Sequence, residues 1–390
     1  MKPLEGIRVL DLSRVLAGPY CTMLLADMGA EIVKIERPGE GDDARAFSPF
    51  IGEESAYFMS INRGKKSVVL DFKKEEDMKI FWELIKESDI IVENFRPGTM
   101  EKLGMGYEDI KLANPKIIYA GISGFGHTGP YSKRAAYDML AQAMSGLMSI
   151  TGEPGGPPVR VGTSIGDITA ALFGTIGILL ALNVRNKTGL GQKVDVAMLD
   201  SQVAILENAI ARYEVTGKVP GPIGTRHPSI APFQGFPTKD YYVIIPCGND
   251  ALWEKFCRVL GMDDFRNDPR FKTNKDRIEH VDELEEIIAS ITKTKTTDQW
   301  VDLLNEAGHP VGVINTVDKV VNDPQINARD MIVELEHSKA GKIRVAGNPI
   351  KLSLTPGEVS KPSPILGEHT REILKNVLGW SEERINKHMK

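Results

Sequence analysis

IRVLDLSRVLAGPYCTMLLADMGAEIVKI, residues 7–35, contains two β-rich runs on either side of a helical pattern. The first run, 7–12, is followed by a loop, apolar periodicity predicts a helix over about 20–28, and 31–35 is the second strand. Further strands are predicted at 66–72, 89–95 and 116–122, with amphipathic helices such as 75–87 between them. Because strands alternate with helices, the sequence predicts an α/β fold with a doubly wound, mostly parallel sheet.

The composition of the chain indicates a globular protein rather than a nucleic-acid-binding or secreted one. At 390 residues the chain is long enough for two or three domains, and 42% hydrophobic with 26% charged residues is ordinary for a soluble protein. The formal net charge of -5, with Lys and Arg interleaved among acidic residues, argues against a nucleic-acid partner. Cys21, Cys247 and Cys257 have neither metal-ligand spacing nor a disulfide framework, and the N-terminal residues lack a signal pattern. We therefore expect a cytoplasmic protein.

Proline and glycine become dense in GKVPGPIGTRHPSIAPFQGFP, residues 217–237, which predicts a linker between domains. Residues 1–216 are expected to form the N-terminal part of a large domain, and 238–330 a smaller α+β domain. The segment 331–390 is predicted to return to the large domain and to dock a last helix, starting near residue 366, on it. In the smaller domain, strands are predicted at 241–247 and 312–315, and helices at 249–260, 281–292 and 297–307.

Asp167 stands before the longest weakly polar run of the chain, within GTSIGDITAALFGTIGILLAL, residues 162–182. The first interpretation makes Asp167 the N-cap of a helix over 168–182. The second is a transmembrane span, but glycines and threonines break the run and it is too short to cross about 30 Å of hydrocarbon. A helix that is apolar on all sides is instead expected in a buried core, so we expect no membrane partner. The third interpretation is chemical: Asp167 is a nucleophile held ionised by the positive end of the helix.

Two loops that carry basic residues lie beside predicted strands. NRGKKS, residues 62–67, leads into a strand, and NFRPG, residues 94–98, follows one. Each loop is either a charged surface turn or an anion clamp in which Arg, Lys and backbone N–H groups bind phosphates. Because ligands of open α/β sheets bind at the carboxyl ends of the strands, the second interpretation predicts a ligand with several phosphates and an adenine covered by Phe95 or a neighbouring apolar side chain.

Two classes of nucleotide-binding protein lack their motifs in this chain. Glu36 ends the second strand, where it would hold a ribose hydroxyl, but the preceding loop offers only Gly18 instead of a Gly-x-Gly-x-x-Gly motif, and Arg37 suits a phosphate. This disfavours a nicotinamide dinucleotide. GISGFGHTGPY, residues 121–131, is rich in glycine but lacks the Lys-Ser/Thr of a P-loop, which argues against a nucleoside triphosphatase.

Longer motifs are spread over nearly the whole chain. They are LxGIRVLDLSRVLAGP at 4–19, GAEIVKIERPGxGD at 29–42, NRGKKS at 62–67, VENFRPG at 92–98, the pair Tyr137-Asp138, TGLGQKVDVAMLDS at 188–201 and LGEHT at 366–370. On these residues the chain resembles the class III CoA-transferases, the family that includes formyl-CoA transferase and carnitine CoA-transferase. Together the motifs are far more specific than any single glycine motif.

The resemblance implies a ping-pong transfer of coenzyme A from an acyl-CoA donor to a carboxylic acid acceptor. The nucleophilic aspartate of the family falls on Asp167, whose carboxylate would form a mixed anhydride and then an aspartyl-CoA thioester. Coenzyme A is then a substrate, and no metal or redox cofactor is required. The resemblance also implies an interlocked homodimer, in which a Rossmann-like large domain takes the N- and C-terminal parts of the chain and the small domain closes the site.

The same resemblance assigns the residues that contact coenzyme A. Val15, Leu16 and Arg37 are assigned to its nucleotide end, and Tyr137 is also a polar neighbour of the nucleophile. The full set is Val15, Leu16, Arg37, Ile61, Asn62, Arg63, Gly64, Lys65, Asn94, Phe95, Arg96, Lys102, Arg134, Ala135, Tyr137 and Asp138.

The chain departs from formyl-CoA transferase at two places. Residues 226–232, RHPSIAP, stand where that enzyme has a run of glycines covering the nucleophile, and Ala135 stands where it has a lysine, with Arg134 adjacent as a substitute. These departures bear on the formyl and oxalate pair of substrates more than on the chemistry. Arg226 and His227 are candidates to bind the carboxylate of a different acceptor.

Two other functions stay open. An α-methylacyl-CoA racemase needs a histidine immediately before an aspartate in the segment that matches Tyr137-Asp138, and a tyrosine phenol is poorly matched to abstracting an α-proton at neutral pH. A non-catalytic acyl-CoA-binding protein would use the same anion clamp without covalent chemistry at Asp167. The identities of the acyl group and of the acceptor are encoded in no motif.

Overall fold

The computed structural model describes residues 1–389, which form two compact units. The small unit comprises Met148–Val159 and Val215–Asp323, and the large unit comprises the rest of the described chain. The linker predicted at 217–237 is therefore wrong at its C-terminal end, because β9 (Phe233–Pro237) pairs with β10 (Tyr242–Pro246) in the small unit. β9 is an edge strand, where a proline costs no ladder hydrogen bond, so the density of prolines misplaces the boundary.

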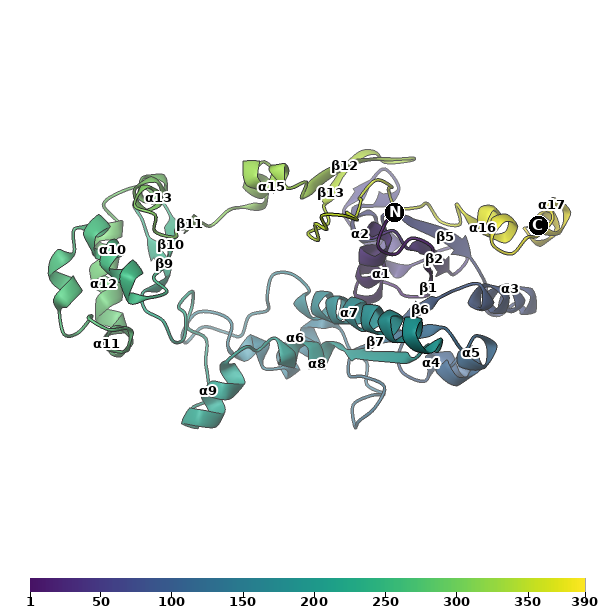
Figure 1. The fold of residues 1–390 in the computed structure, drawn as a ribbon, viewed down its shortest axis with the longest axis horizontal. Coiled ribbons are helices and arrows are strands. Elements are labelled where there is room, and N and C mark those ends of the chain that lie inside the picture. Colours follow the sequence, from purple (N-terminus) through teal and green to yellow (C-terminus); the bar gives the residue numbers. More distant parts are fainter. Residues whose placement is uncertain (390) are drawn as a thin grey trace. The chain divides into compact units, whose positions relative to one another are not determined.

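The large unit is built on a six-stranded sheet in the order β5-β2-β1-β6-β7-β8, in which every neighbouring pair is parallel (Figure 1). The large parallel sheet predicted from the sequence is confirmed. The chain winds outward from β1 to β5, returns beside β1 at β6 and then winds the other way. Strand order thus reverses between β1 and β6, which is where open α/β sheets bind their ligands. The strands are β1 (Arg8–Asp11), β2 (Glu31–Glu36), β5 (Lys65–Val69), β6 (Ile90–Glu93), β7 (Ile118–Ser123) and β8 (Lys193–Ala197).

Helices cover both faces of this sheet, because successive strand residues point to opposite sides. Val9 belongs to the apolar core on one face, whereas Leu10 belongs to the core on the other. The C-terminal helix predicted near residue 366 begins at Thr370, whose Oγ1 accepts the Val69 N–H at 3.2 Å and so fixes the helix to β5. The first face carries α1 (Ala17–Asp27) and α7 (Ile165–Thr188), and the second carries α3 (Glu75–Lys86), α5 (Tyr107–Ala113), α16 (Thr370–Asn376) and α17 (Glu382–His388) (Figure 1).

Short elements connect these strands and helices. The large unit contains α2 (Ala56–Ile61), α4 (Thr99–Lys102), α6 (Asp138–Met144), α8 (Met198–Ala204), α15 (Pro324–Ala328), the 3-10 helix η1 (Asp43–Ala46), and the hairpins of β3 (Phe50–Ile51) with β4 (Glu54–Ser55) and of β12 (Ile332–His337) with β13 (Gly341–Ala346). The elements η2 (Leu147–Ser149) and α9 (Ala209–Thr216) cross from one unit to the other along the chain.

The small unit packs helices on a three-stranded antiparallel sheet in the order β11-β10-β9. Trp253, Phe256 and Trp300 are almost fully buried in its core. Its other elements are α10 (Asp250–Leu260), η3 (Asp263–Asn267), α11 (Asn274–Glu279), α12 (Val281–Thr292), α13 (Thr297–Glu306), β11 (Gly312–Val313) and α14 (Val317–Val320).

One side of α7 is buried on the sheet and the other is exposed. Gly174 allows the close approach, since a Cβ there would lie 2.8 Å from the Ile122 Cδ1. The expectation that the helix is buried on all sides is wrong for a single chain, because apolar side chains spaced four residues apart form an exposed stripe of Leu172, Ile176, Leu180 and Val184. Within residues 1–389, α7 is the one helix whose length and composition would suit a membrane span. Of its most apolar stretch of 18 residues, 44% is buried inside the protein.

Candidate active site

The turn after β1 brings the first residues of α1 to the point where strand order reverses. α1 begins at Ala17, and the side chain of its N-cap residue, Leu16, makes no capping hydrogen bond. The first N–H groups of a helix lack intrahelical partners and carry the positive end of the helix dipole. The Ala17 N–H donates to the carboxylate of Asp167 on α7. Asp167 therefore caps a helix other than its own.

The N-cap position predicted for Asp167 is wrong, because α7 begins at Ile165 and Asp167 lies within its first turn. The cap of α7 comes from Asp138, whose Oδ1 accepts the Gly166 N–H at 2.7 Å. Gly166 permits this approach, since a Cβ there would lie only 2.9 Å from that oxygen and 2.3 Å from the Gln202 Nε2. With the cap supplied by Asp138, the carboxylate of Asp167 faces α1 and keeps partial exposure to solvent.

The surroundings of Asp167 make its negative charge costly. Burial, with the Asp138 carboxylate as the second cause, raises the pKa of Asp167 to about 7, although the Ala17 hydrogen bond opposes this. Burial and the charge of Asp167 also raise the pKa of Tyr57 to about 12, so a neutral phenol on α2 lies near the same carboxylate. A carboxylate with a raised pKa is more basic than an ordinary one and is therefore a stronger nucleophile once ionised. No signal in the sequence selects Tyr57, because its charged neighbours come from distant segments.

A cavity of about 280 Å³ opens beyond the carboxyl ends of β1, β2 and β5. Two of the residues predicted to contact coenzyme A, Arg37 and Phe95, line it. Asp43 accepts hydrogen bonds from Arg14 at 3.0 Å and from Arg37 at 2.9 Å. The Arg14 guanidinium lies 5.7 Å from the centre of the Phe95 ring. The cavity combines guanidinium groups with aromatic surface, which suits a phosphorylated adenosine.

Several residues that line this cavity are not distinguished by any pattern in the sequence. They are Arg14, Asp43, Leu70, Phe72, Lys73 and Leu103. The strand predicted at 66–72 is too long at its C-terminal end, because β5 ends at Val69 and residues 70–72 belong to the loop that follows it. Placing that strand end correctly would have selected them by the same carboxyl-end rule that selected residues 94–98.

In the basic loop predicted as an anion clamp at residues 62–67, two of the three cations fold inward. Arg63 is buried and donates two hydrogen bonds to the Asp27 carboxylate, at 3.0 and 2.7 Å. Lys65 is also buried, and its Nζ donates to the Asp11 Oδ2 at 3.0 Å and to the Asn62 Oδ1 at 2.8 Å. Since buried charges require partners, both cations are used within the fold and neither is available to a phosphate. The predicted clamp is therefore not formed by these side chains.

The other predicted contact residues divide by exposure. Leu16 and Ile61 are buried in a small apolar cluster against which Val15 packs. Asn94 uses its side-chain amide on the backbone of Arg14, and Gly64 is partly buried. Asp138 is buried as the cap of α7, and its contact with coenzyme A stays a prediction. Five predicted residues are exposed but do not line the cavity beside Arg37, namely Arg96, Lys102, Arg134, Ala135 and Tyr137.

The two candidates for an acceptor carboxylate lie in the small unit. Arg226 pairs with Asp282 at 2.7 Å and also with Glu285. The ring centre of His227 lies 5.2 Å from that of Phe233. The charge of Arg226 is thus already neutralised by two carboxylates of its own unit.

Three comparisons relate the chain to known proteins. The model of CoA-transferase family III matches residues 4–370. The chain is 43% identical to the succinyl-CoA:glutarate CoA-transferase of Mus musculus over 388 residues, covering 99% of this chain and 89% of that protein. It is 44% identical to the acetyl-CoA:oxalate CoA-transferase of Acetobacter aceti over 352 residues, covering 90% of this chain and 89% of that one. The crystal structure of a CAIB/BAIF family protein from Brucella suis matches with a TM-score of 0.85 at 40% identity, covering 95% of this chain and 98% of that one.

We expect Asp167→Asn to stabilise the folded protein, and more so at high pH. The folded state holds the pKa of Asp167 at about 7, above its ordinary value of 3.8. The folded state therefore binds this proton more tightly than the unfolded state, and stability is lost as the pH rises from about 4 to about 7. Asparagine is neutral at every pH and avoids this loss. Thermal unfolding should give a melting temperature about 2 to 4 °C above wild type near pH 8.5 and a smaller gain near pH 5.5.

Asp302→Asn, which changes an exposed carboxylate of α13, is the matched control and should give no gain that depends on pH. An Asp167→Asn protein less stable than wild type near pH 8.5 would contradict the assigned environment of Asp167.

Proposed function

We propose, from the premise that the chain belongs to CoA-transferase family III, that Asp167 carries first the acyl group and then coenzyme A in a ping-pong reaction. The chain is a CoA-transferase, since proteins named for that activity are 43% and 44% identical to it over most of its length. One observation carries the mechanistic proposal: the carboxylate of Asp167 lies in the first turn of α7 and accepts the N–H of the first residue of α1.

The proposed reaction has two half-reactions that mirror one another. An oxygen of Asp167 attacks the thioester carbonyl of the donor, the C–S bond breaks, and an acyl-aspartyl anhydride and the CoA thiolate form. The thiolate attacks the aspartyl carbonyl, which releases the donor's acid and leaves an aspartyl-CoA thioester. The acceptor carboxylate attacks that thioester and expels the thiolate, which then takes the acceptor's acyl group from the second anhydride and restores Asp167. No electrons are exchanged, so the proposal needs neither a metal nor a redox cofactor.

The surroundings of Asp167 suit this chemistry. Each attack creates an oxyanion, and the N–H groups in the first turn of a helix are donors of the kind that stabilise one. The Ala17 N–H already binds the resting carboxylate. The burial that raises the pKa of Asp167 also limits the access of water, which would hydrolyse the anhydride.

We assign the cavity beside Arg37 to the nucleotide end of coenzyme A. Arg14, Arg37 and Lys73 would face its phosphates, and Phe72 and Phe95 its adenine. Ser13 and Arg14 line this cavity, and three residues further along the same turn Ala17 contacts Asp167. A pantetheine arm that follows the turn would therefore lead from the cavity to the nucleophile.

The alternatives are a racemase and a catalytically silent acyl-CoA-binding protein. A racemase needs an imidazole where this chain has Tyr137, whose side chain is exposed. A silent binder would use the cavity beside Arg37 but would form no covalent bond at Asp167. Covalent trapping separates these functions.

We propose succinyl-CoA and glutarate as the substrates to test, because the relative from Mus musculus is named for this pair. We expect wild-type protein incubated with succinyl-CoA and then with hydroxylamine to carry a hydroxamate on Asp167, detected by peptide mass spectrometry. Asp167→Ala should lower transfer from succinyl-CoA to glutarate by about a thousandfold or more, because the covalent carrier is lost, while coenzyme A still binds. Asp200→Ala, an exposed carboxylate of α8, should keep wild-type transfer. An unlabelled wild type would support the silent binder, and transfer retained by Asp167→Ala would refute the mechanism.

Arg37→Ala should raise the KM for acyl-CoA by about tenfold and lower kcat by less than about threefold, since a contact far from the reacting atoms contributes to binding alone. Arg371→Ala removes an exposed arginine that pairs with Glu382 between the C-terminal helices, and its kinetics should match wild type. Steady-state kinetics with varied succinyl-CoA measure both constants. A defect of Arg37→Ala confined to kcat would overturn the assignment of the cavity.

We also propose that a second copy of this chain covers the exposed stripe of α7 defined above. Contiguous exposed apolar side chains are costly in water and are typical of surfaces that bind another protein. Leu180 is 62% exposed at the centre of the stripe. This proposal fits the interlocked homodimer that the family resemblance implies.

Light scattering after gel filtration should give the mass of a dimer for wild type and that of a monomer for Leu180→Glu, because the new charge would be buried without a partner. Leu112→Glu tests a single apolar residue that is 83% exposed on α5 and should leave the dimer intact. A wild-type monomer, or a Leu180→Glu dimer, would contradict the proposal.

A further inference from the structure

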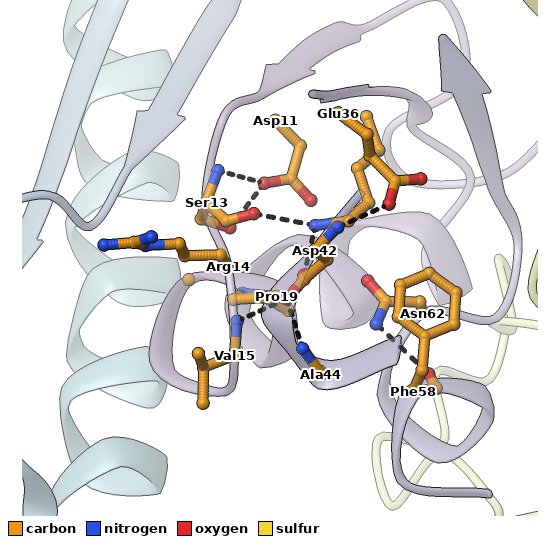
Figure 2. Close-up of polar contacts among 12 residues, drawn as sticks. Asp11, Ser13, Arg14, Val15, Pro19, Glu36, Asp42, Ala44, Phe58 and Asn62 are labelled. Carbon is orange, nitrogen blue, oxygen red and sulfur yellow. Dashed lines mark hydrogen bonds and ion pairs between the residues drawn. The ribbon is translucent and has the colours of Figure 1, made fainter. Parts of the chain in front are cut away.

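The turn between β1 and α1 is held by side chains rather than by other backbone (Figure 2). The Ser13 N–H donates to the Asp11 Oδ1 at 2.9 Å, and the Ser13 carbonyl accepts from the Lys34 Nζ at 2.7 Å. The Arg14 N–H donates to the Asn94 Oδ1 at 2.9 Å, and the Arg14 carbonyl accepts from the same amide at 2.7 Å. Four of the backbone groups of this three-residue turn thus bind side chains from three strands or their ends.

The third residue of the turn has a strained backbone. Val15 has a φ of 66°, in the left-handed region that a β-branched residue rarely adopts. A conformation of this kind persists only where the surroundings hold it, and its energetic cost is on the order of 1–3 kcal/mol. The Val15 N–H donates to the Asp42 Oδ1 at 2.9 Å, and Figure 2 shows the Asp42 side chain directed at the turn. Asp42 is therefore the direct partner of the strained residue.

The carboxylate and the backbone N–H of Asp42 also bind other groups of the fold. Its Oδ1 also accepts the Ala44 N–H at 2.9 Å, and its Oδ2 lies 2.8 Å from the Lys34 Nζ. The side chains of Lys34 and Asp42 have exposed fractions of 0% and 1%. The backbone N–H of Asp42 donates to the Glu36 Oε2 at 2.9 Å. Lys34 thus contacts both ends of the turn: it donates to the carbonyl of Ser13 and pairs with Asp42, which binds Val15.

We propose that Asp42 is a positioning residue for the transfer reaction: with Lys34 it holds Val15 in the left-handed conformation and so aims the Ala17 N–H at the carboxylate of Asp167. The proposal rests on the proposed function, in which Asp167 is the nucleophile. Asp42 acts through the turn and needs no contact with the reacting atoms. Gly18 tightens the same turn, because a Cβ there would lie 2.2 Å from the Ser13 Cβ.

The geometry explains why so many buried charges lie beneath a short turn. Val15 is two residues before Ala17, so a change in its φ would rotate the first turn of α1 relative to Asp167. A displacement of about 1 Å in a reacting group can cost about a hundredfold in rate. A buried ion pair such as Lys34 and Asp42 contributes little net stability, because the cost of desolvation offsets the attraction. A role in fixing the geometry of the turn would explain why this pair is present.

The test compares two buried carboxylates that each pair with a buried cation. Asp42→Ala removes the partner of Val15, and Asp27→Ala removes the partner of Arg63 at the opposite end of α1. We expect Asp42→Ala to lower kcat by about a hundredfold. Asp42 also lines the cavity beside Arg37, so the KM for acyl-CoA does not serve to distinguish the two variants. Asp27→Ala should keep the kcat of wild type once the rate is divided by the folded fraction.

A second readout separates positioning from a general structural role. The Ala17 hydrogen bond lowers the pKa of Asp167, so its loss in Asp42→Ala should move the acidic limb of the profile of kcat/KM against pH to higher pH. Asp138 and Tyr57 also face Asp167. Asp42→Ala leaves the Asp138 side chain in place, and it removes one of the negative charges that raise the pKa of Tyr57, so the Tyr57 phenol stays neutral over the acidic limb. Asp27→Ala should leave the limb in place.

These outcomes are distinguishable from failure of the proposed function. If wild type forms no hydroxamate on Asp167, the proposed function fails whatever Asp42 does. If wild type is labelled and Asp42→Ala keeps both kcat and the acidic limb, the positioning role is overturned. Should Asp42→Ala not fold, Asp42→Asn keeps the volume and one acceptor but loses the charge held by Lys34. It should lower kcat by about tenfold with the same shift, and wild-type values would equally overturn the inference.

Discussion

The hydrogen bond from the Ala17 N–H to the Asp167 carboxylate connects the first turn of α1 to the first turn of α7. Ala17 follows β1, at the point where strand order reverses, and Asp167 lies in the first turn of α7, which packs on α1. Gly174 lets α7 approach the sheet closely, and Gly166 makes room for the cap from Asp138. The proposed nucleophile, the first turn of α1 and the edge of the proposed coenzyme A cavity thus lie close together because of how α7 packs.

The surroundings of Asp167 disfavour the negative charge of its carboxylate. Burial and Asp138 raise the pKa of Asp167, and the Ala17 N–H partly offsets them. A fully offset carboxylate would be a weak nucleophile, and one without any compensation would stay protonated at neutral pH. The orientation of the Ala17 N–H therefore contributes to the pKa of Asp167, and we propose that the buried pair of Lys34 and Asp42 beneath the turn fixes that orientation.

Local patterns were sufficient for the sheet but not for the site. The strands predicted at 66–72, 89–95 and 116–122 begin at residues 65, 90 and 118, because alternation with helices is a property of neighbouring residues. The role of Arg63 could not be predicted in this way, since nothing local distinguishes an exposed cation from one buried against Asp27. The apolar run after Asp167 leaves three interpretations of this residue open. Only the resemblance to the family selects the nucleophile among them. Its neighbours Ala17, Asp138 and Tyr57 come together only in the folded chain.

The central claim, that Asp167 is the covalent carrier, is tested most directly by the path of an oxygen atom. An acceptor carboxylate that contains a heavy oxygen isotope would attack the aspartyl thioester, and the later cleavage of the anhydride would leave one acceptor oxygen on Asp167. After turnover with an acyl-CoA donor and a labelled carboxylic acid that the protein accepts, mass spectrometry of the peptide that contains Asp167 should find the heavy isotope in that side chain. A side chain that remains unlabelled after many turnovers would contradict the account.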